Sequence, residues 1–115
     1  MVAQVIINKY AEQGKNSPNG EIYLHLSIGA EFVAECSELE IAVVGVEFFH
    51  RKGEHVIPVI PIISIDCSSI LDKYLEWKDV VNNCNKAVMV ALDLEITRDN
   101  TQYFNPSLLE ETEWK

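Results

Sequence analysis

The stretch EIAVVGVEFFHRKGEHVIPVIPIISI, residues 40–65, decides what kind of fold this chain can form. Its first part, residues 40–50, is long and apolar, and its valines and phenylalanines are typical of a β-strand. The residues RKGE at 51–54 then precede a second apolar run at 55–65. A connection of this length that contains glycine fits a β-hairpin.

The second apolar run is interrupted by two prolines, Pro58 and Pro61. Each proline lacks a backbone N–H, which disfavours a fully paired central strand here. We therefore expect this run to pair with the first strand near 55–57, to continue irregularly through the prolines, and to be regular again by Ile62. The prolines also oppose edge-to-edge aggregation of a very apolar strand.

Strands are also expected outside the hairpin. Residues 21–28 alternate cleanly between apolar and polar side chains, as a half-buried strand does. Residues 31–40 fit a short helix as well as a strand, and we expect a strand over 31–36. The further predicted strands span residues 4–11 and 87–97.

The main helix is predicted at about residues 69–85. Apolar or aromatic residues recur there at alternating spacings of four and three, which places them on one helical face: Ile70, Tyr74, Trp77, Val81 and Cys84. Asparagines at 82, 83 and 85 are typical of a helix end.

These elements predict an α+β fold with an antiparallel or mixed sheet of five to six strands and this one helix on one face. The alternative is a β-sandwich with a single helix. Residues 41–49, 56–65 and 87–92 carry apolar side chains on both strand faces, and one helix covers only one face. A second copy of the chain would cover the other face, so a homodimer is expected.

The length of 115 residues fits one domain, which we place at residues 1–104. Residues 105–115 are then an acidic C-terminal tail that forms a short helix or a docking segment. Pro106 is expected at the first position of its helical turn.

The charge balance limits the partners. The chain has 9 basic and 18 acidic residues, which disfavours binding to nucleic acid or to anionic membranes and is compatible with a basic protein partner. Its 3 cysteines are widely spaced, and we find neither a signal peptide nor a long apolar span. We therefore expect a cytoplasmic protein without a cofactor, whose cysteines pack as small core residues.

Two sets of residues suggest chemistry, and neither matches a known motif. His50 and His55 would lie opposite each other across the hairpin, near Glu47 and Glu54, as candidate metal ligands. Exposed histidines at a turn are more commonly solvated, so we expect no metal site.

The candidates for catalysis are His25 and Cys67. His25, on a polar strand face, would serve as a general base only beside a nucleophile. Cys67 precedes the predicted helix, where the dipole can lower a thiol pKa, but a buried cysteine fits the position better. With no catalytic motif present, we expect no catalytic residues.

The binding surfaces that the sequence suggests are acidic or apolar. No lysine or arginine lies between Lys15 and Arg51, so the acids there are expected to form a face that attracts a basic partner. The apolar run and the tryptophan near the C-terminus offer apolar contacts. The expected binding residues are Glu31, Glu35, Glu38, Glu40, Val56, Ile57, Val59, Ile60 and Trp114.

The sequence thus favours a non-catalytic interaction protein, either an inhibitor of the immunity type or an adaptor subunit, that binds a basic partner. One alternative is a chaperone-like or small apolar-ligand-binding module that uses an exposed sheet face. The other is a small enzyme of unknown reaction.

Overall fold

The computed structural model describes residues 2–11, 15–16, 22–52, 55–59, 64–71 and 76–114. The longer elements are α1 (Val2–Ala11), β2 (Ile22–His25), α2 (Gly29–Glu38), β3 (Ala42–Lys52), β4 (His55–Pro58), α4 (Trp77–Arg98) and β6 (Tyr103–Leu109). The shorter ones are β1 (Lys15–Asn16), the 3-10 turn η1 (Leu26–Ile28), β5 (Ser64–Asp66), α3 (Ser68–Leu71) and α5 (Glu111–Trp114).

The sheet is antiparallel, with the order β2-β6-β3-β4. Two short strands add to it, β1 beside β2 and β5 beside β3. The predicted α+β class with a long helix is confirmed. The predicted five to six strands are not, because four of the described strands are longer than three residues, and β1 and β5 have only 2 and 3.

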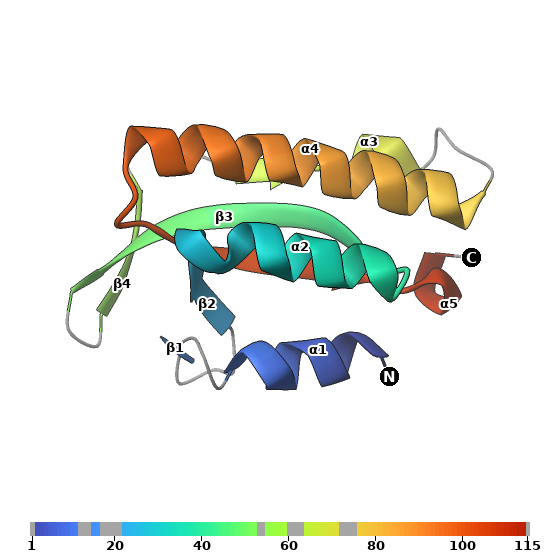
Figure 1. Ribbon diagram of the computed structural model, residues 1–115, viewed down its shortest axis with the longest axis horizontal. Helices are drawn as coiled ribbons and strands as arrows, with labels where there is room; N and C mark the ends of the chain where they lie inside the picture. The colour runs from blue at the N-terminus through green and yellow to red at the C-terminus, as the bar shows by residue number, and fades with distance from the viewer. Residues whose placement is uncertain are drawn as a thin grey trace.

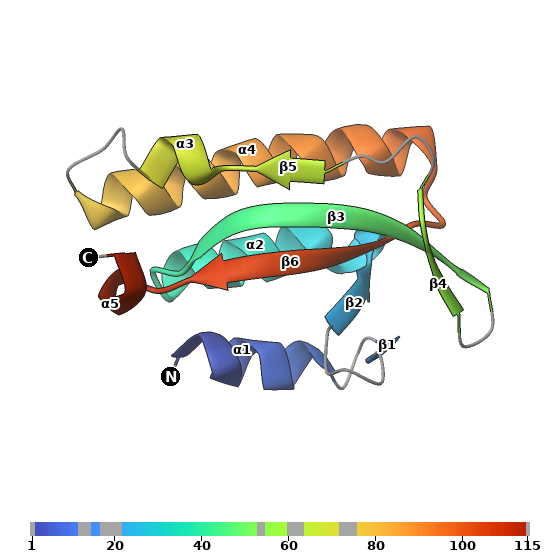
Figure 2. The same cartoon turned by 180° about the vertical axis from the view of Figure 1, so that it is seen from behind.

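Helices cover one face of this sheet (Figure 1). α4 lies along β3 and beside α2, and α1 packs near β2 at the other side of α2. Seen from behind, β3 and β6 lie in front of α2, and no described helix crosses them (Figure 2). The described part of the chain is therefore a sheet with its long helices on one face, and not the alternative sandwich.

The core lies between the helices and the sheet. The ring of Phe32 on α2 meets Tyr10 of α1 edge-on, with centroids 5.1 Å apart, and Phe104 of β6 at 5.9 Å. α2 and α4 approach closely at Gly29, where an added Cβ would lie 2.9 Å from Leu92 Cδ1. These contacts tie all three long helices to the central strand β6.

The β3–β4 hairpin is confirmed, with Lys52 paired to His55 and His50 to Ile57. After the hairpin, Phe49 is paired with Pro58, and Glu47, two residues earlier in β3, is paired with Ser64. Pro58 and Ser64 are six residues apart. The edge segment therefore holds four more residues than the part of β3 it passes. This agrees with the irregular course predicted from the prolines, although residues 60–63 themselves lie outside the described residues.

The main helix is not where the sequence placed it. α4 begins at Trp77 and ends at Arg98, so it overlaps only the second half of the predicted helix 69–85, and α3 is a separate short helix. The strand predicted at 87–97 is wrong, since those residues form the second half of α4. Val90 and Leu94, which were expected to be apolar strand residues, are 52% and 67% exposed on this helix.

Two other predicted strands are helices. Residues 4–11 lie in α1, where Ile6 and Tyr10, four residues apart, turn to the core. Residues 31–36 lie in α2, where Phe32, Val33 and Cys36 share the buried face, as the helical alternative required.

The C-terminal residues are also placed differently. Residues 105–109 complete β6, between β2 and β3, instead of opening a tail. Pro106 is opposite Val46 in this strand and does not begin a helical turn. A short helix does follow, at α5. No described helix has the length and apolar character needed to cross a membrane.

Candidate functional site

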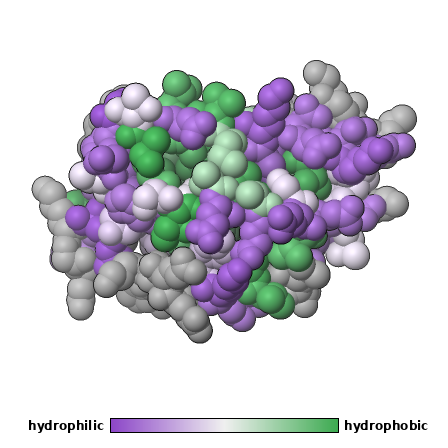
Figure 3. All heavy atoms as spheres, viewed as in Figure 1, coloured by the Kyte–Doolittle hydropathy of each residue, from purple (hydrophilic) through white to green (hydrophobic). Residues whose placement is uncertain are grey.

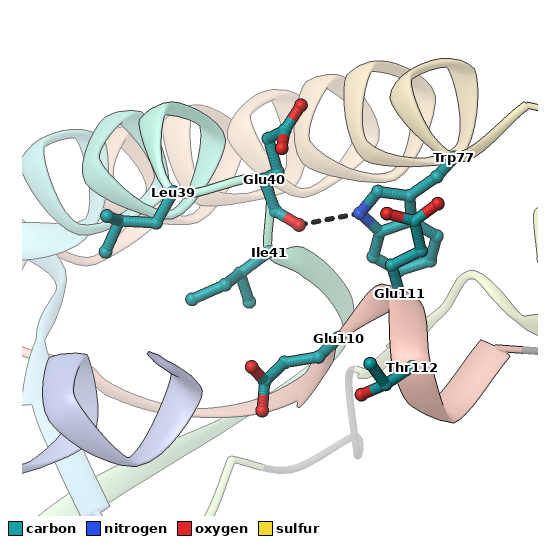
Figure 4. A pocket seen from close by; sticks show the side chains of 7 residues that line it. All are labelled: Leu39, Glu40, Ile41, Trp77, Glu110, Glu111 and Thr112. Carbon is teal, nitrogen blue, oxygen red and sulfur yellow. Dashed lines mark hydrogen bonds between the residues drawn. The ribbon is translucent and has the colours of Figure 1, made fainter. Parts of the chain in front are cut away.

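The described chain has a pocket of about 160 Å³ at the end of the molecule where α2 ends, α4 begins and β6 leads into α5 (Figure 4). Its lining comes from these four segments: Leu39, Glu40, Ile41, Trp77, Glu110, Glu111 and Thr112. The lining residues are thus one tryptophan, two aliphatic residues, three glutamates and a threonine, and Figure 4 shows the Glu40 carboxylate directed away from the other lining side chains.

Strand pairing brings the distant parts of the pocket together. Ala42 at the start of β3 pairs with Leu109 at the end of β6, so the residues just outside this pair are neighbours. Trp77 fixes the third part, since its Nε1–H donates to the carbonyl of Glu40 at 2.7 Å. Figure 4 shows this bond above the Glu110 and Thr112 side chains.

α5 is held over this end by a second tryptophan. Trp114 Nε1 donates to the carbonyl of Leu71 at 3.0 Å, and its ring centroid is 5.5 Å from that of Trp77. The backbone N–H of Glu110 donates to Glu113 Oε1 at 3.1 Å. Trp114, which the sequence suggested as a binding residue, therefore packs on its own domain.

This end of the molecule is strongly acidic. We define the acidic end as Glu38, Glu40, Glu76, Glu110, Glu111 and Glu113, which lie in or next to the pocket-lining segments. Lys78 contributes a positive charge here, with its Nζ 3.9 Å from Glu76 Oε2. Hydrophilic side chains dominate the right-hand end of the surface view, where α2 ends and α4 begins (Figure 3).

The chemistry of the pocket is that of cation binding. Carboxylates attract an ammonium or guanidinium group, and an indole ring adds affinity for such a group when it lies over the ring face. The volume is below the range of about 300–1,000 Å³ typical of small-molecule sites. It suits one long side chain of a partner better than a separate metabolite.

Glu40 lies at a position that normally favours glycine. Its φ is 57°, and the bonds Glu40 N→Ser37 O and Ile41 N→Cys36 O make it the left-handed residue that terminates α2. A side chain in this conformation costs about 1–2 kcal/mol. A glutamate therefore occupies a position whose backbone conformation favours glycine.

Replacing Glu40 with glycine is expected to raise the free energy of unfolding by about 1 kcal/mol, because the strain of the Cβ is removed. Urea denaturation measures this change. Glu40→Ala is the matched control, since it loses the carboxylate and keeps the Cβ. Equal stabilities for the two variants would show that the positive φ carries no cost.

The acids predicted to form one face are divided by the structure. Glu38 and Glu40 lie at the acidic end, whereas Glu31 lies in the first turn of α2, at its other end. Glu35 forms an ion pair with Lys9 of α1. This hydrogen bond to Lys9 lowers the pKa of Glu35, which therefore serves to attach α1.

The apolar candidates are also separated. Ile57 is 39% exposed on β4, and Val59 is buried at 3%. Val59 donates its N–H to the carbonyl of Phe48, so it belongs to the core. The Val56 side chain and Ile60 lie outside the described residues.

The two histidines of the hairpin are offset along it. The prediction that His50 and His55 lie opposite each other is wrong, because His50 is opposite Ile57. Nε2 of His50 lies 3.9 Å from Asp99 Oδ2. The part of the chain that the structure describes contains no group of three or more His, Cys, Asp or Glu residues placed to hold a metal ion.

His25 and Cys67, the candidates for catalysis, both have structural roles. His25 precedes η1, and its Nδ1 accepts the N–H of Ser27 at 3.1 Å, so it caps that turn. Cys67 is buried and free, and burial raises the pKa of its thiol, which is opposite to the activation considered for a helix N-terminus. Neither residue borders the pocket.

Sequence reasoning missed Trp77, Glu110 and Glu111 as site residues. Trp77 was assigned to a helical core face, and the two glutamates to a tail. A signal was present, because acids lie both at the start of the strand predicted at 40–50 and beside the C-terminal leucines. It becomes readable only when Ala42 is known to pair with Leu109.

No protein-family model matches the chain, and neither a curated protein nor a solved structure matches it significantly.

Proposed function

We propose that the protein is a non-catalytic interaction protein, an inhibitor or an adaptor subunit, whose acidic end binds a basic protein partner in the cytoplasm. The observation that carries this proposal is the pocket itself. Trp77, Glu110 and Glu111 are among its lining residues, and none of the described lining residues is basic.

The net charge of −9 supports the proposal, because a surplus of acid steers a basic partner toward the molecule before contact. The placement of Leu39 supports it as well. This leucine is 43% exposed beside the carboxylates, which gives the rim an apolar contact in addition to charge. Interfaces that combine a small apolar centre with a charged surround are typical of protein recognition.

The test uses a peptide of alternating arginine and glycine as the basic probe, with binding followed by calorimetry. We expect saturable one-to-one binding whose affinity falls about tenfold between about 50 and about 300 mM salt, because added ions screen exposed charges. Glu110→Gln combined with Glu111→Gln is expected to weaken binding about tenfold.

The matched control removes two acids elsewhere, by Glu31→Gln with Asp93→Asn on the exposed faces of α2 and α4. It changes the net charge equally and is expected to alter affinity less than about twofold. Equal losses in the two double variants would show that binding follows net charge and not the acidic end. Absence of saturable binding would contradict the proposed function.

A further inference from the structure

Two buried cysteines from different elements lie together at one side of the core. Cys67 is the residue between β5 and α3, and Cys84 is in the first half of α4. Cys67 is 3% exposed and Cys84 is fully buried, and both are free thiols. Seen from behind, β5 and α3 lie in front of α4, and α3 contacts this helix (Figure 2).

The strand β3 holds both cysteines at the same place. The backbone N–H of Cys67 donates to the carbonyl of Val44 at 2.8 Å. Next to Cys84 on α4, the Oδ1 of Asn85 accepts the N–H of Val43 at 2.7 Å. Consecutive residues of one strand therefore fix the two backbones that carry the thiols. The side chains interact directly, with the Cys84 thiol donating a hydrogen bond to Cys67.

This contact makes the two thiols unequal. Burial raises the pKa of both, but their hydrogen bond lowers the pKa of Cys67 and raises that of Cys84. Cys67 also lies between two short elements, since β5 has 3 residues and α3 has 4. Segments with few contacts open locally at a lower free-energy cost than the core does. Cys67 is therefore the thiol that meets an oxidant first, and Cys84 lies beside it.

We propose that Cys67 and Cys84 form a reversible disulfide that joins the start of α3 to α4, with a small organic disulfide as the oxidant. The Cys67 thiolate attacks one sulfur of the oxidant, which forms a mixed disulfide and releases one small thiolate. The Cys84 thiolate then attacks the Cys67 sulfur and releases the second. The two small thiolates take up the two protons that the protein loses, so the protein is oxidised by two electrons and the oxidant is reduced to two thiols.

The bond would close the segment that supplies part of the pocket. Between the two cysteines lie Leu71, whose carbonyl accepts from Trp114, and Trp77, which donates to Glu40. The cysteines are 17 positions apart, and a cross-link over a loop of this size restricts the unfolded chain. In a reducing compartment thiols reverse the reaction, so the bond would be transient there. Its formation does not depend on whether the acidic end binds a basic partner.

The test exposes the reduced, folded protein to excess hydroxyethyl disulfide at about pH 8.5, near the ordinary thiol pKa. After unfolding, the free thiols are counted by alkylation and mass spectrometry. We expect one free thiol to remain, that of Cys36, and a peptide map that links Cys67 to Cys84. The melting temperature of the oxidised protein is expected to rise by about 10 °C, and dithiothreitol is expected to reverse the rise.

Cys36→Ala is the matched control, because it removes another fully buried cysteine and is expected to leave the link between Cys67 and Cys84 intact. Cys84→Ala is expected to stop the reaction at a mixed disulfide on Cys67. Where this variant does not fold, the thiol count and peptide map of the original protein are sufficient. Three free thiols after prolonged exposure, a lasting adduct on Cys67 or a link to Cys36 would each overturn the proposal. A lower melting temperature of the oxidised protein would overturn it too, because the bond would then strain the fold.

Discussion

Replacing Asn85 with leucine is expected to lower the free energy of unfolding by about 4 kcal/mol, because two buried backbone groups lose their partner. Asn85, on α4, is only 3% exposed. Its Oδ1 accepts the N–H of Val43 at 2.7 Å, and its Nδ2 donates to the carbonyl of Ile41 at 3.0 Å. Nδ2 also lies 2.9 Å from Ser37 Oγ as a donor.

The hydrogen bonds of Asn85 lie at the start of β3, beside an irregularity in its pairing with β6. Between Val43 and Gly45 the pairing of β3 with β6 shifts, so the backbone at the start of β3 is not fully satisfied by its neighbouring strand. Asn85 supplies the missing donor and acceptor from the helix layer. Each group left unpaired in the core costs about 1–3 kcal/mol, and the leucine cannot replace either bond.

Urea denaturation gives the free energy, and Asn82→Leu on the exposed face of α4 is the matched control. The control is expected to change stability by less than about 0.5 kcal/mol, since exposed substitutions away from special features have small effects. A loss below about 1 kcal/mol for Asn85→Leu would show that water reaches and satisfies Val43 and Ile41.

Raising the pH from about 9 to about 11 is expected to lower the free energy of unfolding by about 5 kcal/mol through two thiols alone. Burial raises the pKa of Cys36 to about 12, with the charge of Glu35 adding to it. Burial also raises the pKa of Cys84 to about 12, with Cys67 close by. Their ordinary value is 9.0.

The sign follows from proton binding. Between these two values the folded protein keeps both thiols protonated, whereas the unfolded chain releases the protons, so rising pH favours unfolding. Each thiol contributes about 1.4 kcal/mol per pH unit in this window. Burial raises the pKa of Tyr10 too, which adds a loss in the same direction above about pH 10.

The measurement is the slope of unfolding free energy against pH, from urea titrations at several values above 9. A variant with Cys36→Ala and Cys84→Ala removes both thiols and is expected to show a slope smaller by about 2.7 kcal/mol per pH unit. The comparison is between the slopes of the two proteins, so a pH-independent loss of stability caused by the smaller side chains does not affect it. Identical slopes would mean that the two thiols titrate alike in both states.

The hairpin was predictable because its signals are local. The apolar run ending at His50, the residues Arg51 to Glu54 and the prolines of the next run all act within a few residues of one another. The structure confirms the pairing and its disturbance after Pro58. The offset of His50 from His55 was missed, since exact register depends on the turn and not on the flanking pattern.

The second half of α4 was wrongly predicted as a strand because an apolar residue is exposed there and an acidic residue is buried. Leu92, Leu94 and Ile96 alternate with polar residues, which is a strand pattern. In the helix, however, Leu94 is exposed and Glu95 is buried. Glu95 is acceptable there because Arg98 donates to its carboxylate at 2.7 Å and Gln102 at 3.0 Å. No local rule identifies an acid that a later residue will satisfy.

Only part of the candidate site could be predicted from the sequence. The acids at 38–40 and the C-terminal glutamates were recognised separately, as a charged block and a tail. Their meeting depends on β6 entering the sheet beside β3, which is a contact between residues more than sixty positions apart. Pattern rules concern neighbours along the chain, so a pocket built across such a distance lies beyond them.

The position of β6 has a consequence for how the molecule is made. Along the chain this strand follows all the other described strands, yet it lies between β2 and β3 and joins them into one sheet. During synthesis, β2 and β3 therefore exist without the neighbour that they share until Tyr103–Leu109 have been translated. Their apolar edges must stay unpaired, or be protected by other proteins, until then. Completion of this sheet therefore depends on contacts between residues far apart along the chain, and the folding rate is expected to be limited by this long-range strand insertion instead of by the helices.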